Sequence, residues 1–278
     1  MTSKSKTLWQ SILIMVLGLY VLFCLVIYCM QKQMLFPAHA AMPVATDWQP
    51  KAGSQAFLVG QCGKLHVANW PVAIETGAVE KGTVMIFHGN AESLASVEHQ
   101  VPLFHAQGYS VMAWDYAGYG QSTDCWTNEQ DMLQDAETAY QWLAQQTTLP
   151  IVIYGRSVGS GPAVYIASKY AVQKLLLVSP YDSLTNVAGA NMPFFVPVRY
   201  LMRFPMASTQ WINQVKAPIY AIHGLADTLI QPARAAELFK NTEQKIQVKW
   251  VKDAGLNVDG VAQFAPWLAN SVKSQLRE

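Results

Sequence analysis

The segment of this sequence best suited to covalent chemistry is Gly155-Arg156-Ser157-Val158-Gly159. A serine hydroxyl is a weak nucleophile unless a neighbouring base takes its proton. Here a short apolar run ends just before the motif, and a stretch with helical spacing follows it. A G-x-S-x-G between a strand and a helix is the pattern of a nucleophile elbow, whereas the same five residues in a loop can arise by chance. We expect Ser157 to be a nucleophile at a helix N-terminus, where free N–H groups favour negative charge.

A second segment, His88-Gly89-Asn90-Ala91-Glu92, follows another apolar run. A loop at the end of a strand beside the elbow can supply one backbone N–H to an oxyanion, and the residue after the nucleophile supplies the other. The expected oxyanion donors are the backbone N–H groups of Asn90 and Val158. We expect His88 to border the substrate pocket in a structural role rather than to carry a proton.

The acid that would orient a catalytic base is expected at Asp227, in His223-Gly224-Leu225-Ala226-Asp227. This segment also ends an apolar run, and the chain order serine, acid, histidine fits an elbow serine. Two alternatives remain open. Asp227 can cap the helix that Gln231-Pro232 begins, and Asp182 can be the acid instead.

Around these motifs, short apolar runs typical of strands alternate along the chain with stretches that have helical spacing. This alternation predicts an α/β fold whose mostly parallel sheet is covered by helices on both faces. Strands are expected at residues 83–88, 109–115, 150–154, 175–178, 219–222 and 246–251, with an opening hairpin at 56–59 and 65–70; helices are expected at 94–107, 128–146, 160–170 and 261–272.

Residues 186–211 interrupt the alternation with a concentration of Phe and Met among prolines. We expect a short inserted lid over Ser157, with Phe194 and Phe195 lining an apolar acyl pocket, because Phe and Met form adaptable apolar surfaces. The alternative is that this segment docks on a membrane.

The N-terminus carries an uncharged apolar run at residues 12–30, which nearly spans a hydrocarbon core of about 30 Å as a helix. We expect residues 1–33 to be a cytoplasmic tip and a signal anchor, and residues 34–278 to be one domain. Lys4 and Lys6 precede the run and only Lys32 closely follows it, so the positive-inside rule places the domain outside the cytoplasm. A cleaved signal peptide is the alternative, since Ala38-His39-Ala40 fits a cleavage site, although the run exceeds a usual signal core.

Composition narrows the class of protein further. The formal net charge is +1, which gives no reason to expect a nucleic-acid partner. Of the four cysteines, Cys24 and Cys29 lie in the apolar run. Cys62 and Cys125 lie in the expected domain and can pair if it is extracytoplasmic and if their Cα atoms are close enough. No spacing indicates a metal, and no metal or organic cofactor is expected.

From residue 34 onward the chain resembles the α/β-hydrolase superfamily. It is most similar to the membrane-anchored branch with domains like serine aminopeptidases and acyl-protein thioesterases. The resemblance rests on QKQMLFP, HGNAE, DYAGYGQS, GRSVGS, SPYDSL and HGLAD. It implies hydrolysis of an ester, thioester or amide through an acyl-serine, as an esterase or thioesterase would perform it. Where the family pattern places its catalytic histidine before the last helix, this chain has Leu256, in Asp253-Ala254-Gly255-Leu256-Asn257, and no histidine follows His223.

Two functions therefore remain open from the sequence. One is a membrane-bound serine hydrolase of a lipid-like or small acyl substrate, impaired by Leu256. The other is an inactive relative that binds acyl groups or proteins at the membrane. Replacement of the missing base by His88 or His223 is a further, weaker possibility.

Overall fold

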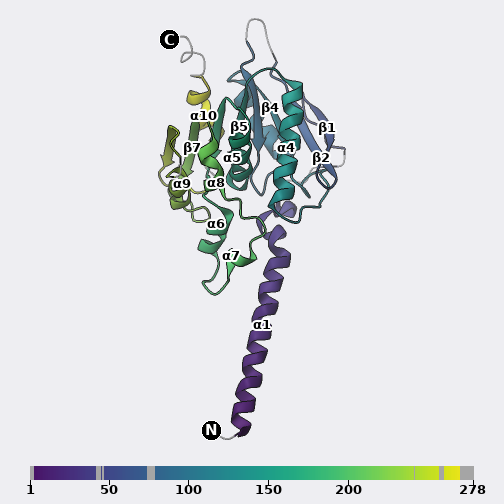
Figure 1. Ribbon diagram of the computed structural model, residues 1–278. Helices are drawn as coiled ribbons and strands as arrows, with labels where there is room; N and C mark the ends of the chain where they lie inside the picture. Colours follow the sequence, from purple (N-terminus) through teal and green to yellow (C-terminus); the bar gives the residue numbers. More distant parts are fainter. Residues whose placement is uncertain are drawn as a thin grey trace.

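The computed structural model describes residues 3–41, 45, 47–73, 79–240, 242–256 and 260–269. One long N-terminal helix, α1 (Ser3–Leu35), leads into a domain built on an eight-stranded sheet (Figure 1). The stretch Leu8–Ala40 is long and apolar enough to cross a membrane, with a mean hydropathy of 2.9 in its most apolar window. That window has no part buried inside the protein, as expected of a helix whose apolar side chains contact lipid.

The sheet has the strand order β1-β2-β4-β3-β5-β6-β7-β8. Antiparallel pairing is confined to β1 with β2 and β2 with β4, and the later strands pair in parallel. The strands are β1 (Ser54–Val59), β2 (Lys64–Trp70), β3 (Gly82–Phe87), β4 (Tyr109–Trp114), β5 (Ile151–Arg156), β6 (Lys174–Val178), β7 (Ile219–Gly224) and β8 (Ile246–Val251). The predicted α/β sheet, including its opening hairpin, is confirmed.

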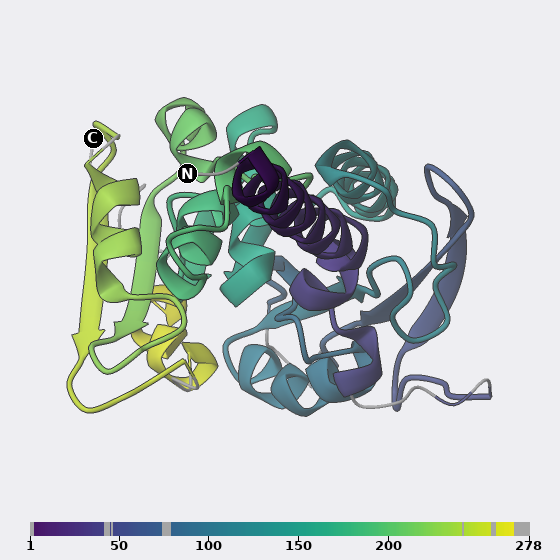
Figure 2. The same cartoon turned by 90° about the horizontal axis from the view of Figure 1, so that it is seen from below.

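Helices cover both faces of the sheet, as Figure 2 shows from below. They are α2 (Leu94–Val97), α3 (Val101–His105), α4 (Glu129–Gln146), α5 (Ser160–Lys169), α6 (Leu184–Asn191), α7 (Val198–Leu201), α8 (Ser208–Trp211), α9 (Pro232–Phe239) and α10 (Gly260–Ala269); short 3₁₀ turns are η1 (Ala38–Ala40), η2 (Glu98–Gln100), η3 (Ser157–Gly159) and η4 (Ile212–Gln214).

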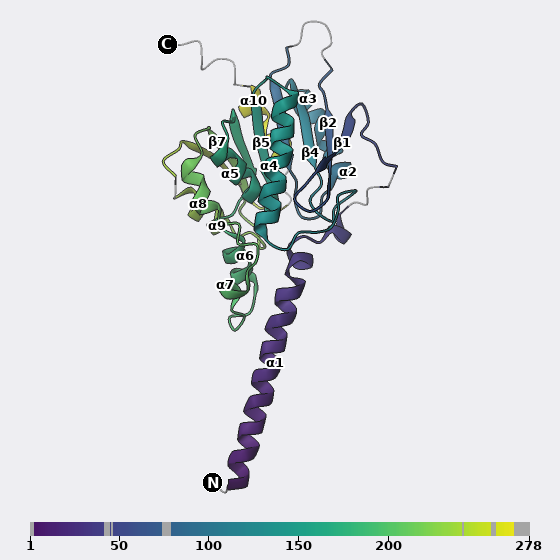
Figure 3. The ribbon, with the colours of Figure 1, turned by 45° about the vertical axis from the view of Figure 1, so that its right-hand side comes forward.

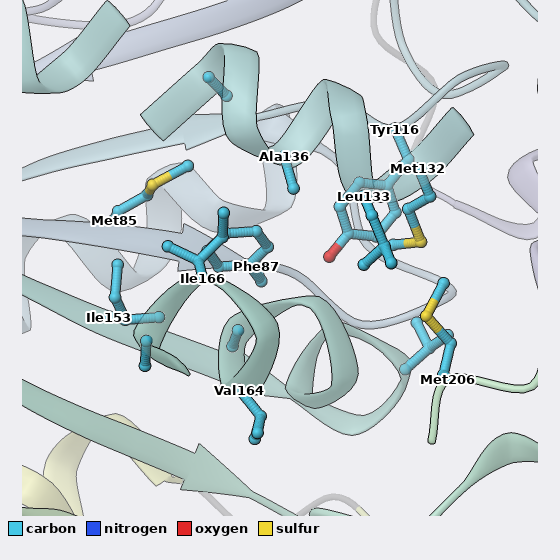
Figure 4. Close-up of a cluster of buried hydrophobic side chains, with 14 of the residues drawn as sticks. Met85, Phe87, Tyr116, Met132, Leu133, Ala136, Ile153, Val164, Ile166 and Met206 are labelled. Atoms are coloured by element: carbon cyan, nitrogen blue, oxygen red, sulfur yellow. The ribbon is translucent and has the colours of Figure 1, made fainter. Parts of the chain in front are cut away.

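Two hydrophobic clusters lie on opposite faces of the sheet because successive strand residues point to opposite sides. In β3, Met85 and Phe87 join the cluster under α4 and α5, which Figure 4 shows in close-up. Val84 and Ile86 join the other cluster, which α2, α3 and α10 cover. Burial on both faces explains why the central strands read as continuous apolar runs.

The single helix expected at 94–107 is wrong, because the structure divides it into α2, η2 and α3. Pro102 lies in the first turn of α3. A proline lacks the N–H that would continue a helix but fits a first turn, so the chain restarts there. At the other end of the chain, α10 confirms the start of the expected last helix, and the expected residues 270–272 lie outside the described part.

A disulfide joins Cys62 and Cys125, whose Cα atoms are 5.9 Å apart. It ties the turn between β1 and β2 to the loop that follows β4 and precedes α4. The pairing that the sequence left open is therefore present in the fold, while Cys24 and Cys29 on α1 are free thiols.

The domain meets α1 through the edge of the sheet at which the parallel strands end (Figures 1 and 3). Phe36, just after α1, packs edge-on against Trp126 and Phe204, with ring centroids 5.8 and 5.1 Å away. Trp126 follows the carboxyl end of β4, and Phe204 follows α7. The carboxyl edge, where an α/β fold places its functional loops, therefore faces α1.

Candidate active site

Ser157 lies directly after β5 and opens the turn η3 that leads into α5. Its φ is +51°, a left-handed conformation that costs a residue with a side chain about 1–3 kcal/mol. The chain tolerates the cost because the flanking glycines allow the elbow to pack tightly. A Cβ on Gly159 would lie 2.3 Å from the Phe87 carbonyl oxygen, and one on Gly155 would lie 2.5 Å from the Ala163 Cβ.

The elbow packing gives a first prediction. Gly159→Ala should lower the free energy of unfolding by about 1–3 kcal/mol or more, since backbone atoms cannot move aside for the new Cβ. It should also reduce any reaction at Ser157. The matched control is Gly189→Ala in α6, where a Cβ meets nothing within 4 Å. There alanine should stabilise by about 0.5–1 kcal/mol. Urea unfolding of the full chain in detergent compares the two, and equal midpoints would contradict the packing argument.

The loop at His88–Glu92 is held beside the elbow by tyrosine hydroxyls. Tyr119 donates to the Asn90 carbonyl at 2.6 Å, and Tyr181 donates to the Val158 carbonyl at 2.9 Å. The two residues expected to supply oxyanion N–H groups thus each have their own carbonyl fixed by a buried tyrosine. Burial raises the pKa of Tyr119 and of Tyr181 far above the usual value, so both stay protonated donors.

An ion pair also couples this loop to the elbow. The Glu92 carboxylate accepts from the Gly89 N–H at 2.6 Å and pairs through its other oxygen with Arg156, the residue before Ser157. The side chains are only 16% and 21% exposed, which makes the pair less screened than a surface salt bridge. Sequence reasoning missed Glu92, Arg156 and the tyrosines as positioning residues, although the motifs that contain them were visible.

His88 is fully buried, and its ring stacks on Tyr116 with centroids 3.9 Å apart. Its Nδ1 donates to the Gly89 carbonyl at 2.8 Å. Burial lowers the pKa of His88, and nearby Asp115 offsets this only in part, so the ring is neutral near pH 7. The expectation that His88 borders the substrate pocket is corrected here, because a ring with no exposed surface offers none to a substrate.

Asp227 follows β7 and is buried, with its two carboxylate oxygens in different situations. One oxygen, Oδ1, accepts from the Leu229 and Ile230 N–H groups at 3.0 and 2.9 Å. The other, Oδ2, has no hydrogen-bond partner among the described residues. A buried carboxylate oxygen without a donor is costly. Asp227 therefore has the arrangement of a triad acid: one oxygen fixes its orientation and the other is open to a ring N–H.

The Nε2 of His223 lies 3.8 Å from this oxygen, Asp227 Oδ2. That distance exceeds a hydrogen bond, and the same Nε2 donates to the Ile230 carbonyl at 2.8 Å. Burial lowers the pKa of His223. One nitrogen of the ring is thus committed to the backbone of the Asp227 loop, while Nδ1 has no hydrogen-bond partner among the described residues.

Leu256 lies at the position where the resemblance places the base. The loop that carries Leu256 is bonded to the loop that carries Asp227, because the Ala226 N–H donates to the Ala254 carbonyl at 2.9 Å. A Cβ on Gly224 would lie 2.2 Å from the same carbonyl, so the two loops touch. Leu256 itself is half-buried and packs against the cluster under α4 and α5. An apolar side chain therefore stands at this position of a loop that contacts the Asp227 loop. Asn257 lies outside the described residues.

The alternative acid, Asp182, already has its partners. Its Oδ2 pairs with Arg234 at 3.0 Å and accepts from Asn186 at 2.7 Å, while Oδ1 accepts from the Ser183 N–H at 2.8 Å. These bonds use both oxygens to fix the start of α6. The geometry therefore favours Asp227 over Asp182 as the acid.

Phe194 and Phe195 lie in the loop between α6 and α7, which points away from the sheet alongside α1 (Figures 1 and 3). Phe195 contacts the Phe23 ring of α1, and Phe194 is fully exposed. Phe195 therefore contacts α1 rather than the elbow, and the expected lid over Ser157 with its acyl pocket stays a prediction. Among the described residues, no group of three His, Cys, Asp or Glu side chains is placed to hold a metal ion.

A serine elbow at the carboxyl edge of a mostly parallel sheet, followed along the chain by a carboxylate after a later strand, defines an α/β-hydrolase site of the serine type. Residues 78–202 match the family described as serine aminopeptidase S33. The human α/β hydrolase domain-containing protein 17B is 30% identical over 203 residues, covering 70% of this chain and 68% of that protein. An uncharacterised protein of Mycobacterium tuberculosis is 29% identical over 215 residues, covering 76% and 74%.

Solved structures agree in fold. An esterase of Pyrococcus furiosus has a TM-score of 0.62 at 20% identity, covering 82% of this chain and 91% of that one. An α/β serine hydrolase without a lid, from Xanthomonas campestris, has a TM-score of 0.59 at 17% identity, covering 82% and 94%. The chain belongs to the α/β-hydrolase superfamily, and by this resemblance it is a hydrolase.

Proposed function

We propose that the protein is a membrane-anchored serine hydrolase that cleaves an ester, thioester or amide of an acyl substrate through an acyl-serine, and that Leu256 makes it slow. The observation that carries this proposal is Ser157 at φ +51° on a fully built elbow. A chain that no longer used its serine would have no reason to keep a strained backbone there.

In the proposed reaction Ser157 Oγ attacks the acyl carbonyl, and the N–H groups of Asn90 and Val158 stabilise the oxyanion. Asp227 has the unpartnered oxygen of a triad acid, but without an imidazole it has no ring to orient. Water must then take the serine proton and deliver one to the leaving group. An oxyanion hole and substrate binding alone retain roughly 10³–10⁴ in rate over water.

One observation favours a second function. The half-buried Leu256 side chain packs against the hydrophobic cluster under α4 and α5. A well-packed leucine supports an inactive relative that binds an acyl group or a protein at the membrane without turning it over.

Reaction with a fluorophosphonate separates the two functions. An impaired hydrolase should label slowly, and the label should disappear in Ser157→Ala, because the oxyanion hole still favours attack on phosphorus. A binding module should give no Ser157-dependent label after long exposure. Thr209→Ala, a change outside the elbow, serves as the matched control for handling of the purified full chain.

The anchor is proposed to stay attached, with the N-terminus in the cytoplasm and the domain outside. Cleavage after Ala40 would remove Gln31 and Phe36, both of which are buried against the domain. The disulfide between Cys62 and Cys125 supports an oxidising compartment for the domain.

We expect N-terminal sequencing of membrane-extracted protein to begin at or near residue 1, because the loss of Phe36 would open the core. A mature start at Ala41 would contradict the anchor. In sealed right-side-out vesicles, external protease should digest the domain, and full protection of the domain would reverse the orientation.

A further inference from the structure

The loop between α6 and α7 exposes apolar side chains at the membrane end of the domain. We define residues 193–200 as the cap tip. Phe194 is 100% exposed, Tyr200 is 86% exposed and Phe195 is half exposed. The Phe194 and Phe195 rings pack edge-on with centroids 5.7 Å apart, and exposed apolar groups gathered in this way mark an interaction site.

The contacts of the cap tip place it at a definite level along α1. At the domain end of α1, Gln31 donates to the Leu201 carbonyl at 2.9 Å and accepts from the Arg203 N–H at 2.6 Å. Farther along, the Tyr20 hydroxyl donates to the Phe195 carbonyl at 2.8 Å. Eleven residues separate Gln31 from Tyr20, so the tip extends about 16 Å along the helix beyond Leu201.

That level lies within the apolar run of the helix. Tyr20 falls in the middle of the uncharged residues 12–30, and the Phe23 ring lies 6.2 Å from the Phe195 ring. If α1 spans a bilayer, the hydrocarbon that surrounds Tyr20 must also surround Phe195. The aromatic rings of the tip then need no covering protein, since lipid covers them.

Charged groups mark where the polar side of the membrane begins. Lys32 pairs with Asp124, and the Arg203 guanidinium lies over the Tyr28 ring at 5.2 Å. Tyrosine and arginine are residues of the membrane interface. Arg199, on α7 two residues before Leu201, has a side chain long enough to reach a headgroup phosphate from this level.

A narrow apolar crevice separates α1 from the cap at the same place. Among the described residues that line it, Gln31 alone is polar. Its amide is engaged by Leu201 and Arg203, so the crevice offers hydrocarbon contacts. Its walls are formed chiefly by Ile27, Met34, Leu35, Met192, Val196 and Leu201.

We propose that the cap tip is inserted into the hydrocarbon of the outer leaflet as a second membrane element beside α1, and that the phospholipid bilayer occupies its exposed face. The inference rests on the proposed membrane span of α1, but it does not depend on catalysis. With two elements in the membrane, the domain cannot rotate freely about α1, and the carboxyl edge with Ser157 is held against the bilayer surface.

The test uses the full chain in phosphatidylcholine vesicles, with Cys24→Ser and Cys29→Ser so that one introduced thiol carries a fluorophore. The positions are Phe194→Cys at the tip, Leu17→Cys in the span and Val79→Cys before β3, at the opposite edge of the domain. Val79 is 80% exposed and Leu17 is 58% exposed. Phosphatidylcholine with a mid-chain nitroxide should remove most of the fluorescence at 17 and 194 and little at 79.

Aqueous iodide should give the opposite pattern. Quenching at 17 but not at 194 by the nitroxide would overturn the insertion of the tip while leaving the anchor in place. Quenching at neither position would overturn both. Because a label can disturb the tip, unlabelled Phe194→Cys is also treated with a membrane-impermeant maleimide. It should react only after denaturation, whereas Val79→Cys should react in intact vesicles, and rapid reaction at 194 would likewise overturn the proposal.

Discussion

Replacing Leu256 with histidine should raise the rate of p-nitrophenyl acetate hydrolysis by at least about 10², while the unmodified chain stays barely above background. A leucine can neither accept the Ser157 proton nor protonate the leaving group. The loop that carries Leu256 is bonded to the Asp227 loop, and Asp227 Oδ2 lacks a donor among the described residues. An imidazole at 256 would supply that donor and place its other nitrogen toward the nucleophile. The full span for a triad histidine is on the order of 10⁶, so the lower figure allows for imperfect geometry.

Two controls make the result specific. The gain should vanish when Ser157→Ala is added, and it should fall sharply with Asp227→Asn, which cannot stabilise the imidazolium. Asp182→Asn should leave the gain in place if that carboxylate serves only Arg234 and α6. For each variant, the initial rate of hydrolysis is measured against substrate concentration in detergent micelles.

Other outcomes have definite meanings. Strong Ser157-dependent hydrolysis in the unmodified chain would require another base, and His223→Gln and His88→Gln would be the first variants to make. We do not expect such hydrolysis, because the His88 and His223 rings are buried and each donates to a backbone carbonyl. Failure of Leu256→His to restore activity in a folded protein would favour the binding function.

The parts of the fold that the sequence predicted are those encoded locally. The continuous apolar runs of β3 and β5 and the glycines around Ser157 depend on residues close together in the chain, so the sequence alone predicted them. The position of Asp227 after β7 was also predictable, because parallel strands bring their carboxyl ends to one edge.

The parts that it did not predict depend on contacts between distant residues. The residues next to Asn90 in the sequence do not indicate that Tyr119 donates to its carbonyl. The residues next to Arg156 likewise do not indicate that Glu92 pairs with it. The direction of the cap is a similar case. Phe and Met density predicted an apolar surface, but only the bonds of Tyr20 and Gln31 show that this surface follows α1. His88 was placed beside a pocket on sequence grounds, whereas its stacking on Tyr116 buries it.

The disulfide should make a large contribution to stability. It closes a sequence separation of 63 residues. Loop-closure entropy for such a separation corresponds to about 4 kcal/mol at 25 °C. The double variant Cys62→Ser, Cys125→Ser should therefore unfold at a markedly lower urea concentration than the unmodified chain, and it leaves neither partner of the disulfide as an unpaired thiol.

The control for this unfolding experiment is a variant that loses cysteine thiols but keeps the disulfide. Cys24→Ser with Cys29→Ser removes two free cysteines of α1 and should leave the unfolding midpoint of the domain unchanged. Reduction of the unmodified chain should reproduce the loss seen in the Cys62/Cys125 variant, and reduction of that variant should change nothing. The loss should be concentrated at β1 and β2, because the bridge holds their turn to the loop before α4 and β1 is an edge strand. Hydrogen exchange should therefore accelerate first in β1. A stability equal to that of the unmodified chain would mean that the bridge does not restrain the unfolded chain as the loop length requires. Faster exchange confined to β7 and β8 would contradict the expected restraint on β1.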